Sequence, residues 1–245
     1  MDLIRPQWPA PSRVQACFTT RDGGVSEGVY AGLNLGNHVA DAPQAVAQNR
    51  QRLRQTLGLA SEPLWLEQVH GTEVFHCQGA ATQQPPRADA AVTRLTGQAL
   101  TVMTADCLPV LLCDEAGSVV ATAHAGWRGL CDGVLEQTVQ AMGMPGAQLL
   151  AWLGPAIGPN AFEVGDEVRA AFMAQDPAAS AAFRPHVPGK WWADLPLLAR
   201  QRLACVGIRR VYGGEFCTHG DARRFYSYRR DGQTGRMAGL IWLTP

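Results

Sequence analysis

Two apolar segments separated by a short turn form the most constraining stretch of this sequence. Residues 108–113 and 118–123 are apolar and rich in residues that favour strands, and residues 114–117 between them are typical of a tight turn. The pattern predicts a β-hairpin at the centre of the fold. Cys107 stands just before the first strand and His124 just after the second, so the open end of this hairpin carries a thiol and an imidazole.

The register of the hairpin decides whether these two side chains face each other. A two-residue loop at Glu115 and Ala116 places Cys107 directly opposite His124, on the same face of the sheet. Glu-Ala is a poor sequence for primed two-residue turns, whereas Gly117 suits a three-residue loop with a bulge. That loop shifts the pairing by one residue and places the two side chains on opposite faces. The sequence leaves both registers open, and joint chemistry requires the first register or a compensating bulge.

Composition bounds the size, the compartment and the partners. The chain has 245 residues, of which 47% are apolar, and the 21 basic residues balance the 21 acidic ones. Without a charge excess we expect neither nucleic acid nor a membrane surface as partner. No run of about 18 apolar residues predicts a membrane span. The seven cysteines are odd in number and form no CxxC pair, which indicates a reducing compartment and predicts a cytoplasmic protein.

Further segments extend the expected fold. Residues 65–70 predict a strand that ends at a histidine, residues 83–87 a surface loop, and residues 225–229 and 237–243 a final hairpin. Strands and helices mix without strict alternation. This favours the α/β (α+β) class, with one domain over residues 1–245 in which helices cover mixed sheets.

Three potential metal ligands stand where an apolar strand meets a polar loop. They are His70, Cys107 and His124, each with small neighbours that leave room for a ligand. A catalytic zinc takes three nitrogen or sulfur ligands and leaves its fourth position to water or substrate. The Cys107–His124 pair could instead form a metal-free thiolate–imidazolium dyad for acyl transfer. Spacing alone leaves both interpretations open.

Six motifs together resemble one protein family. This is the YfiH family, also called laccase-domain proteins or multicopper polyphenol oxidases and linked to peptidoglycan editing, and the resemblance covers essentially the whole chain. An ordered set is far more specific than any single motif. The motifs are TTRDGGVS (19–26), LNLG (33–36), WLEQVHG (65–71), TADCLPV (104–110), AHAGWRG (123–129) and LGPAIG (153–158).

The resemblance implies a fold, a metal and an activity. The implied fold is a layered α/β/β/α arrangement that resembles the cysteine hydrolase domain of cytotoxic necrotizing factor. The implied metal is zinc, bound by His70, Cys107 and His124. The implied activity is phosphorolysis of purine nucleosides, namely adenosine, inosine, guanosine and methylthioadenosine, with adenosine deamination beside it. We expect the protein to act as a monomer on purine nucleosides and phosphate.

Phosphorolysis requires cationic or N–H donors that hold the phosphate. Candidates near the motifs are Arg21, Arg128, Lys190 and Arg229, for each of which a solvated surface role is the alternative. Arg21 is the favoured catalytic candidate because two glycines follow closely. Asn34 could bind ribose or base, or could brace its own loop.

The names given to this family also suggest two alternative functions, an oxidase and a cell-wall enzyme. A multicopper oxidase needs a blue-copper site and a trinuclear cluster, which six histidines without an H-x-H pair cannot supply. A single His2Cys site could still bind copper, because copper outranks zinc in affinity for such ligands. A copper-dependent polyphenol oxidase (laccase) and a peptidoglycan-precursor editing hydrolase therefore remain as alternatives.

Overall fold

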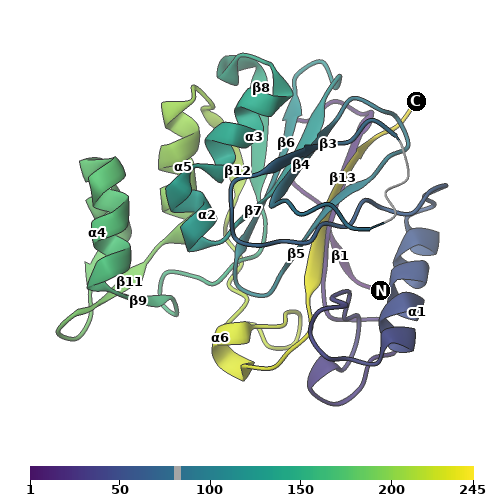
Figure 1. Ribbon diagram of the computed structural model, residues 1–245, viewed down its shortest axis with the longest axis horizontal. Helices are drawn as coiled ribbons and strands as arrows, with labels where there is room; N and C mark the ends of the chain where they lie inside the picture. The colour runs from purple at the N-terminus through teal and green to yellow at the C-terminus, as the bar shows by residue number, and fades with distance from the viewer. Residues whose placement is uncertain (80–83) are drawn as a thin grey trace.

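The computed structural model describes residues 1–79 and 84–245 as a mixed α/β fold built on two large sheets and a small one (Figure 1). In spatial order, the six-stranded sheet contains β12 (Arg210–Gly213), β8 (Leu149–Leu153), β6 (Leu108–Asp114), β7 (Val120–Ala125), β4 (Ala90–Thr93) and β3 (Val74–His76). The four-stranded sheet contains β1 (Leu3–Ile4), β2 (Val14–Thr19), β13 (Met237–Leu243) and β5 (Leu100–Thr104). The small sheet contains β10 (Phe183–Pro185), β11 (Lys190–Ala193) and β9 (Glu163–Gly165).

Helices lie on the outer faces of the two large sheets and beside the small sheet. The helices of the described residues are α1 (Pro43–Thr56), α2 (Trp127–Asp132), α3 (Val134–Met142), α4 (Asp166–Gln175), α5 (Leu195–Cys205) and the short α6 (Tyr228–Asp231). Three 3-10 turns complete the elements, η1 (Gly28–Tyr30), η2 (Gly146–Gln148) and η3 (Pro177–Ala182). Helix α1 packs on the four-stranded sheet, whereas α2, α3 and α5 lie on the opposite side of the molecule (Figure 1).

The buried residues divide into cores between these layers, which confirms the predicted α/β/β/α order. Strand β6 illustrates the reason. Its side chains alternate between faces with a period of two. Val110 and Leu112 therefore join the core under the helices, while Leu111 and Cys113 join the core between the two sheets. A strand buried on both faces is largely apolar, as β6 is from Leu108 to Cys113.

The predicted hairpin forms, but neither predicted register is correct. Pro109, not Cys107, pairs with His124, so the pairing is shifted by two residues from the two-residue-loop register. Because side-chain direction has a period of two, a shift of two leaves every side chain on its predicted face. Cys107 and His124 therefore remain on the same side of the sheet as diagonal neighbours.

The hairpin loop is longer than predicted because Asp114 closes it with its side chain. The carboxylate accepts hydrogen bonds from the Ser118 backbone N–H at 2.6 Å, the Ser118 hydroxyl at 2.7 Å and the Val119 N–H at 3.0 Å. Gly117 adopts a positive φ of 66° within this loop. The prediction assumed the backbone geometry of a primed turn. A turn held by a side chain does not require that geometry.

The predicted strand over residues 65–70 is wrong. This segment makes single bridges, Leu64 with Leu100 and Glu67 with Arg87, rather than a ladder. The Gln68 side chain accepts from the N–H of Met103 and donates to its carbonyl. Hydrogen bonds to side chains thus replace the strand ladder immediately before His70.

The predicted C-terminal hairpin is also wrong. Strand β13 lies between β2 and β5 in the four-stranded sheet, and residues 228–231 form α6. A strand whose residues are all buried is suited to a central position, where both of its edges are paired. Of the predicted loop over residues 83–87, residue 83 lies outside the described residues.

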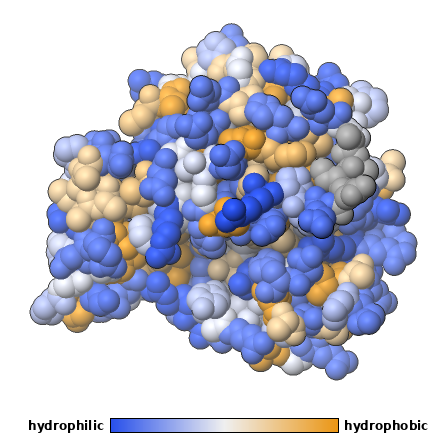
Figure 2. All heavy atoms as spheres, viewed as in Figure 1, coloured by the Kyte–Doolittle hydropathy of each residue, from blue (hydrophilic) through white to orange (hydrophobic). Residues whose placement is uncertain are grey.

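No helix in the described ranges has the length and apolar character of a membrane span. Figure 2 shows that hydrophilic residues cover most of the visible face and that apolar residues reach it only in small groups.

Candidate metal centre

His70 is fixed by an unusual backbone segment. Its φ is +60°, a conformation that non-glycine residues rarely adopt. The N–H groups of Val69, His70 and Gly71 all donate to the carboxylate of Asp89, at 3.1, 2.9 and 2.7 Å. These three bonds hold the strained backbone in place, and the His70 side chain stays exposed.

Asp89 also orients the second histidine. Its Oδ1 lies 2.8 Å from Nδ1 of His124, and both side chains are buried. Burial raises the pKa of Asp89, but the hydrogen bonds from His124 and from the backbone at Gly71 and Val69 hold it below its ordinary value. The ionised carboxylate therefore accepts the Nδ1 proton, which leaves Nε2 of His124 as the metal-binding or proton-accepting nitrogen.

Cys107 follows a second strained residue. Asp106 has a φ of +92°, and its carboxylate accepts from the Thr218 hydroxyl at 2.6 Å, the Ser227 hydroxyl at 3.0 Å and the Arg229 backbone N–H at 2.7 Å. These contacts bring three C-terminal residues to the start of β6 and fix the backbone of Cys107. Strain that is held by several hydrogen bonds is a common feature of functional sites.

The three candidate ligands form one electrostatic group. Burial raises the pKa of the Cys107 thiol, but His124 and His70 outweigh this effect and lower the pKa to about 6. Burial lowers the pKa of His124, yet Cys107 and Asp89 outweigh it and raise the pKa to about 9. In the absence of a metal, the pair is therefore a thiolate beside an imidazolium at neutral pH.

The donor atoms are arranged for one metal ion. One ligand atom from each of His70, Cys107 and His124 lies within 4.8 Å of the other two, and Sγ of Cys107 is 3.8 Å from Nε2 of His70. Gly126 leaves the space for them, because a Cβ there would stand 2.8 Å from Cδ2 of His70 and 3.0 Å from Sγ of Cys107. Two nitrogens and one sulfur fit zinc or copper, and the described residues supply no fourth ligand to this group.

The candidate ligands lie in the wall of a cavity of about 380 Å³. This volume falls within the usual range of small-molecule sites. The lining combines the three ligands with polar and apolar groups from several distant segments. It consists of His38, Gln68, His70, Met103, Thr104, Ala105, Cys107, His124, Tyr228 and Arg236.

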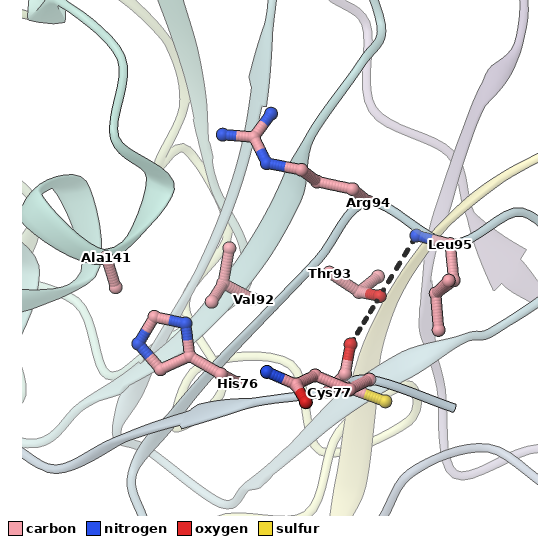
Figure 3. Close-up of a pocket in the computed structure, with 8 residues that line it drawn as sticks. His76, Cys77, Val92, Thr93, Arg94, Leu95 and Ala141 are labelled. Atoms are coloured by element: carbon pink, nitrogen blue, oxygen red, sulfur yellow. Dashed lines mark hydrogen bonds between the residues drawn. The ribbon is translucent and has the colours of Figure 1, made fainter. Parts of the chain in front are cut away.

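A second pocket lacks such chemistry. It measures about 320 Å³ and is lined by His76, Cys77, Gln78, Val92, Thr93, Arg94, Leu95 and Ala141. Figure 3 shows that the Thr93 hydroxyl donates a hydrogen bond to the Cys77 carbonyl and accepts one from the Leu95 N–H. Arg94 donates to the Met142 carbonyl at 2.7 Å. No described group of metal ligands lies here, so we place the functional site at the first cavity.

None of the four cations named from the sequence lines that cavity. The Arg21 guanidinium donates to the carbonyls of Ala222 and Ala31, both at 3.2 Å, and stacks on Tyr226. Arg128 is exposed and stacks on the ring of Trp127. The phosphate role of Arg21 stays a prediction that these contacts do not support.

The other two cations and Asn34 also lie outside the lining of the cavity. Lys190 is exposed at the start of β11, and Arg229 donates through Nη1 to the Glu163 carbonyl at 2.8 Å. Asn34 is fully buried. Its oxygen accepts from the N–H groups of Gly36 and Arg236, and its nitrogen donates to the Asp41 carboxylate. These contacts match the loop-bracing alternative for Asn34.

The structure adds three residues that sequence reasoning missed. Asp89 binds His124 and the backbone at His70, whereas His38 and Arg236 line the cavity. Partial removal from water, followed by the positive charges of Arg236 and Arg50, lowers the pKa of His38. The only signal in the sequence was the position of His38 shortly after the LNLG motif, and no spacing joins His38 or Arg236 to Cys107.

Comparison with known proteins identifies close relatives over the whole chain. Residues 15–244 match the family described as multi-copper polyphenol oxidoreductase laccase. A purine nucleoside phosphorylase of Pseudomonas aeruginosa is 55% identical over 241 residues, which is 98% of each chain. The purine nucleoside phosphorylase YfiH of Escherichia coli is 56% identical over the same length and share.

Solved structures show the same fold. A Neisseria meningitidis protein matches with a TM-score of 0.96 and 50% identity over 100% of both chains. YlmD from Geobacillus stearothermophilus matches with a TM-score of 0.92 and 31% identity, over 100% of this chain and 97% of its own.

Proposed function

This chain belongs to the multi-copper polyphenol oxidoreductase laccase family, also known as the YfiH family, and we propose that it is a zinc-dependent purine nucleoside phosphorylase that also deaminates adenosine. The proposed substrates are adenosine, inosine, guanosine and methylthioadenosine, which phosphate cleaves to the free base and a sugar 1-phosphate. Relatives that bear the name purine nucleoside phosphorylase support the phosphorolytic activity.

One observation carries the proposal, namely the convergence of His70, Cys107 and His124 on a cavity of nucleoside size. These residues would hold the zinc. When bound, a zinc ion with an open position lowers the pKa of a water and polarises a substrate oxygen. Asp89 keeps the Nδ1 proton on His124, so that Nε2 points to the metal position.

The rest of the cavity is suited to an anionic co-substrate and to proton transfer. Among the described residues that line it there is no Asp or Glu side chain, so no carboxylate there repels phosphate. His38, whose pKa is lowered, is a neutral imidazole at pH 7 and can accept a proton during deamination.

The assembly and compartment follow from the same residues. A single chain supplies all three candidate metal ligands, so we propose that a monomer is active. A site that needs a thiolate ligand requires reducing conditions, and all seven cysteines are free. We therefore propose that the protein works in the cytoplasm.

Two alternative functions use the same site. The thiolate character of Cys107 beside His124 favours a metal-free cysteine hydrolase as the second candidate, which would act on peptidoglycan precursors. The family description favours a copper-dependent polyphenol oxidase. The six histidines without an H-x-H pair argue against the multicopper chemistry of a true laccase.

The decisive experiment measures metal and activity on the same preparation. Protein purified without added metal should carry about one zinc per chain and should release adenine from adenosine only when phosphate is present. Cys107→Ala should lose both the zinc and the phosphorolysis. Cys205→Ala is the matched control, because Cys205 is exposed and lies outside the cavity.

Each rival function predicts a different result. A metal-free hydrolase would lose muropeptide cleavage in Cys107→Ala while zinc removal left it intact. A laccase would oxidise phenolic dyes in proportion to its copper content. Full phosphorolysis by zinc-free Cys107→Ala protein would refute the proposed function.

A further inference from the structure

Arg236 is the one Arg, Lys, Asp or Glu among the described residues that line the cavity. It lies in the wall that also contains Cys107, and the negative charges of Cys107 and Asp106 act on its guanidinium. Burial is nevertheless the largest effect and lowers the pKa of Arg236, which reflects how far this cation is removed from water. A partly desolvated cation without a carboxylate beside it in the same wall is an unusual arrangement unless an anion binds there.

The guanidinium has donors to offer. Nη1 donates to the backbone carbonyls of Thr234 and Gly235, at 2.9 and 3.0 Å. Within the described residues, neither Nε nor Nη2 donates to any acceptor, and neither is among the buried unpaired atoms, so both keep access to solvent. Nε and Nη2 form one edge of the guanidinium, which matches two oxygens of a phosphate.

The surrounding loop fixes the backbone of Arg236 at the cavity wall. The Arg236 N–H donates to Oδ1 of Asn34 at 2.8 Å, and its carbonyl accepts from the Leu35 N–H at 3.0 Å. Arg50 holds the Leu35 carbonyl through Nε and Nη2, at 3.0 and 2.8 Å. Gly36 leaves room for the side chain, since a Cβ there would stand 2.8 Å from Cγ of Arg236. A cation held in this way loses little entropy when a ligand binds.

We propose that Arg236 is the phosphate-binding residue of the site, with Nε and Nη2 donating to two oxygens of inorganic phosphate next to the His70, Cys107 and His124 centre. The inference deepens the proposed function and rests on it for the identity of the anion. Asn34 then acts as a positioning residue, because it holds the backbone of Arg236 rather than the substrate. This assignment replaces Arg21, which donates to two backbone carbonyls and does not line the cavity.

The test measures binding of inorganic phosphate to the zinc-loaded protein by isothermal titration calorimetry. Arg236→Gln should bind phosphate about ten- to hundredfold more weakly than the unmodified protein, the usual loss for one hydrogen bond from a charged group, because the glutamine amide can still donate the other. In the phosphorolysis assay, KM for phosphate should rise by the same factor while KM for the nucleoside stays within about twofold. Zinc content, measured on each sample, should remain at one per chain.

Control variants separate this role from folding and from the alternative cation. Arg210→Gln removes an exposed arginine that pairs with Glu115 outside the cavity, and should leave phosphate binding unchanged. Arg236→Lys keeps the charge and the stem, so it tests the forked donors if the Gln variant fails to fold, and should also bind phosphate more weakly. Loss of phosphate binding in Arg21→Ala with retention in Arg236→Gln would overturn the assignment.

The binding arm also distinguishes the two proposals. A protein that binds phosphate through Arg236 but cleaves no nucleoside would refute the phosphorylase activity and leave the anion site standing. Equal phosphate affinity in unmodified protein, Arg236→Gln and Arg236→Lys would refute the anion site whatever the protein catalyses.

Discussion

Asp89→Asn should show what the Asp89 carboxylate contributes to the metal centre, because it leaves all three candidate ligands in place. Each carboxylate oxygen of Asp89 accepts two hydrogen bonds. Oδ1 accepts from the His70 N–H and from Nδ1 of His124, whereas Oδ2 accepts from the N–H groups of Val69 and Gly71. As long as Nε2 of His124 stays free for the metal, all four partners are donors, so the amide nitrogen of an asparagine must face two N–H groups whichever way it is turned.

The expected loss of stability follows from this count. Two bonds to a charged acceptor disappear, each worth roughly 1.5–3 kcal/mol, so the zinc-free variant should be destabilised by about 3–6 kcal/mol. Zinc affinity should fall about 10- to 100-fold, because the orientation and basicity of His124 depend on the carboxylate. Urea unfolding of the zinc-free protein gives the first quantity, and zinc competition with a chelator gives the second.

Asp114→Asn provides the matched control. Asp114 is also fully buried and has a lowered pKa, but one of its partners is the Ser118 hydroxyl, which can reverse and accept from an amide. Its loss should be smaller, about 1–2 kcal/mol, and zinc affinity should not change. Unaltered zinc affinity in Asp89→Asn, or an equal decrease in both variants, would contradict the reasoning.

Acid unfolding should also reveal the contribution of the Asp89 carboxylate to stability. Burial raises the pKa of Asp89, but its hydrogen-bond donors outweigh burial and lower the pKa below 3.8, its value in the unfolded chain. The stability that Asp89 contributes is therefore complete above the unfolded pKa and is lost as pH falls through the folded one. Unfolding measured between pH 7 and pH 3 should show a shallower acid-induced decline in Asp89→Asn than in the unmodified protein.

Three further results are expected. In zinc-free protein, the rate at which iodoacetamide alkylates Cys107 should rise with pH around a midpoint of about 6, because the thiolate is the reactive form. Bound zinc should protect the thiol. A midpoint near the pKa of a free thiol would count against the site. Gly126→Ala should weaken zinc binding by at least about tenfold in the chelator assay, because the added Cβ would crowd His70 and Cys107. Copper-free, zinc-loaded protein should show negligible oxidation of phenolic dyes, and robust oxidation would restore the laccase interpretation.

The candidate metal ligands could be named from the sequence because each one stands inside a short motif, although only Cys107 and His124 lie at strands of the structure. Asp89 could not. Its partners lie 18 to 20 residues away at Val69, His70 and Gly71 and 35 residues away at His124. A carboxylate that binds backbone N–H groups of a distant segment leaves no periodicity or spacing in the sequence, so only the fold identifies it.

Arg236 was missed for a related reason. The predicted hairpin over residues 225–243 made Arg236 an end of a surface loop, whereas in the structure β13 pairs with β2 and β5. That pairing joins segments more than 100 residues apart and brings Arg236 beside the Leu35 loop. Local sequence signals could favour Arg21 over other arginines, but could not indicate which arginine has unoccupied donors in the cavity.

The hairpin explains how Cys107 and His124 come together although their predicted pairing is incorrect. An error of one residue in register would have placed Cys107 and His124 on opposite faces of the sheet, where no metal could join them. The actual difference is two residues, so the alternation of side chains restores the predicted face. The strained Asp106 and the small Gly126 then bring Cys107 to His124 across the diagonal that the pairing leaves. The site therefore depends on a register shift of an even number of residues and on the local backbone at Asp106 and Gly126. It does not depend on the direct pairing that the turn sequence indicated.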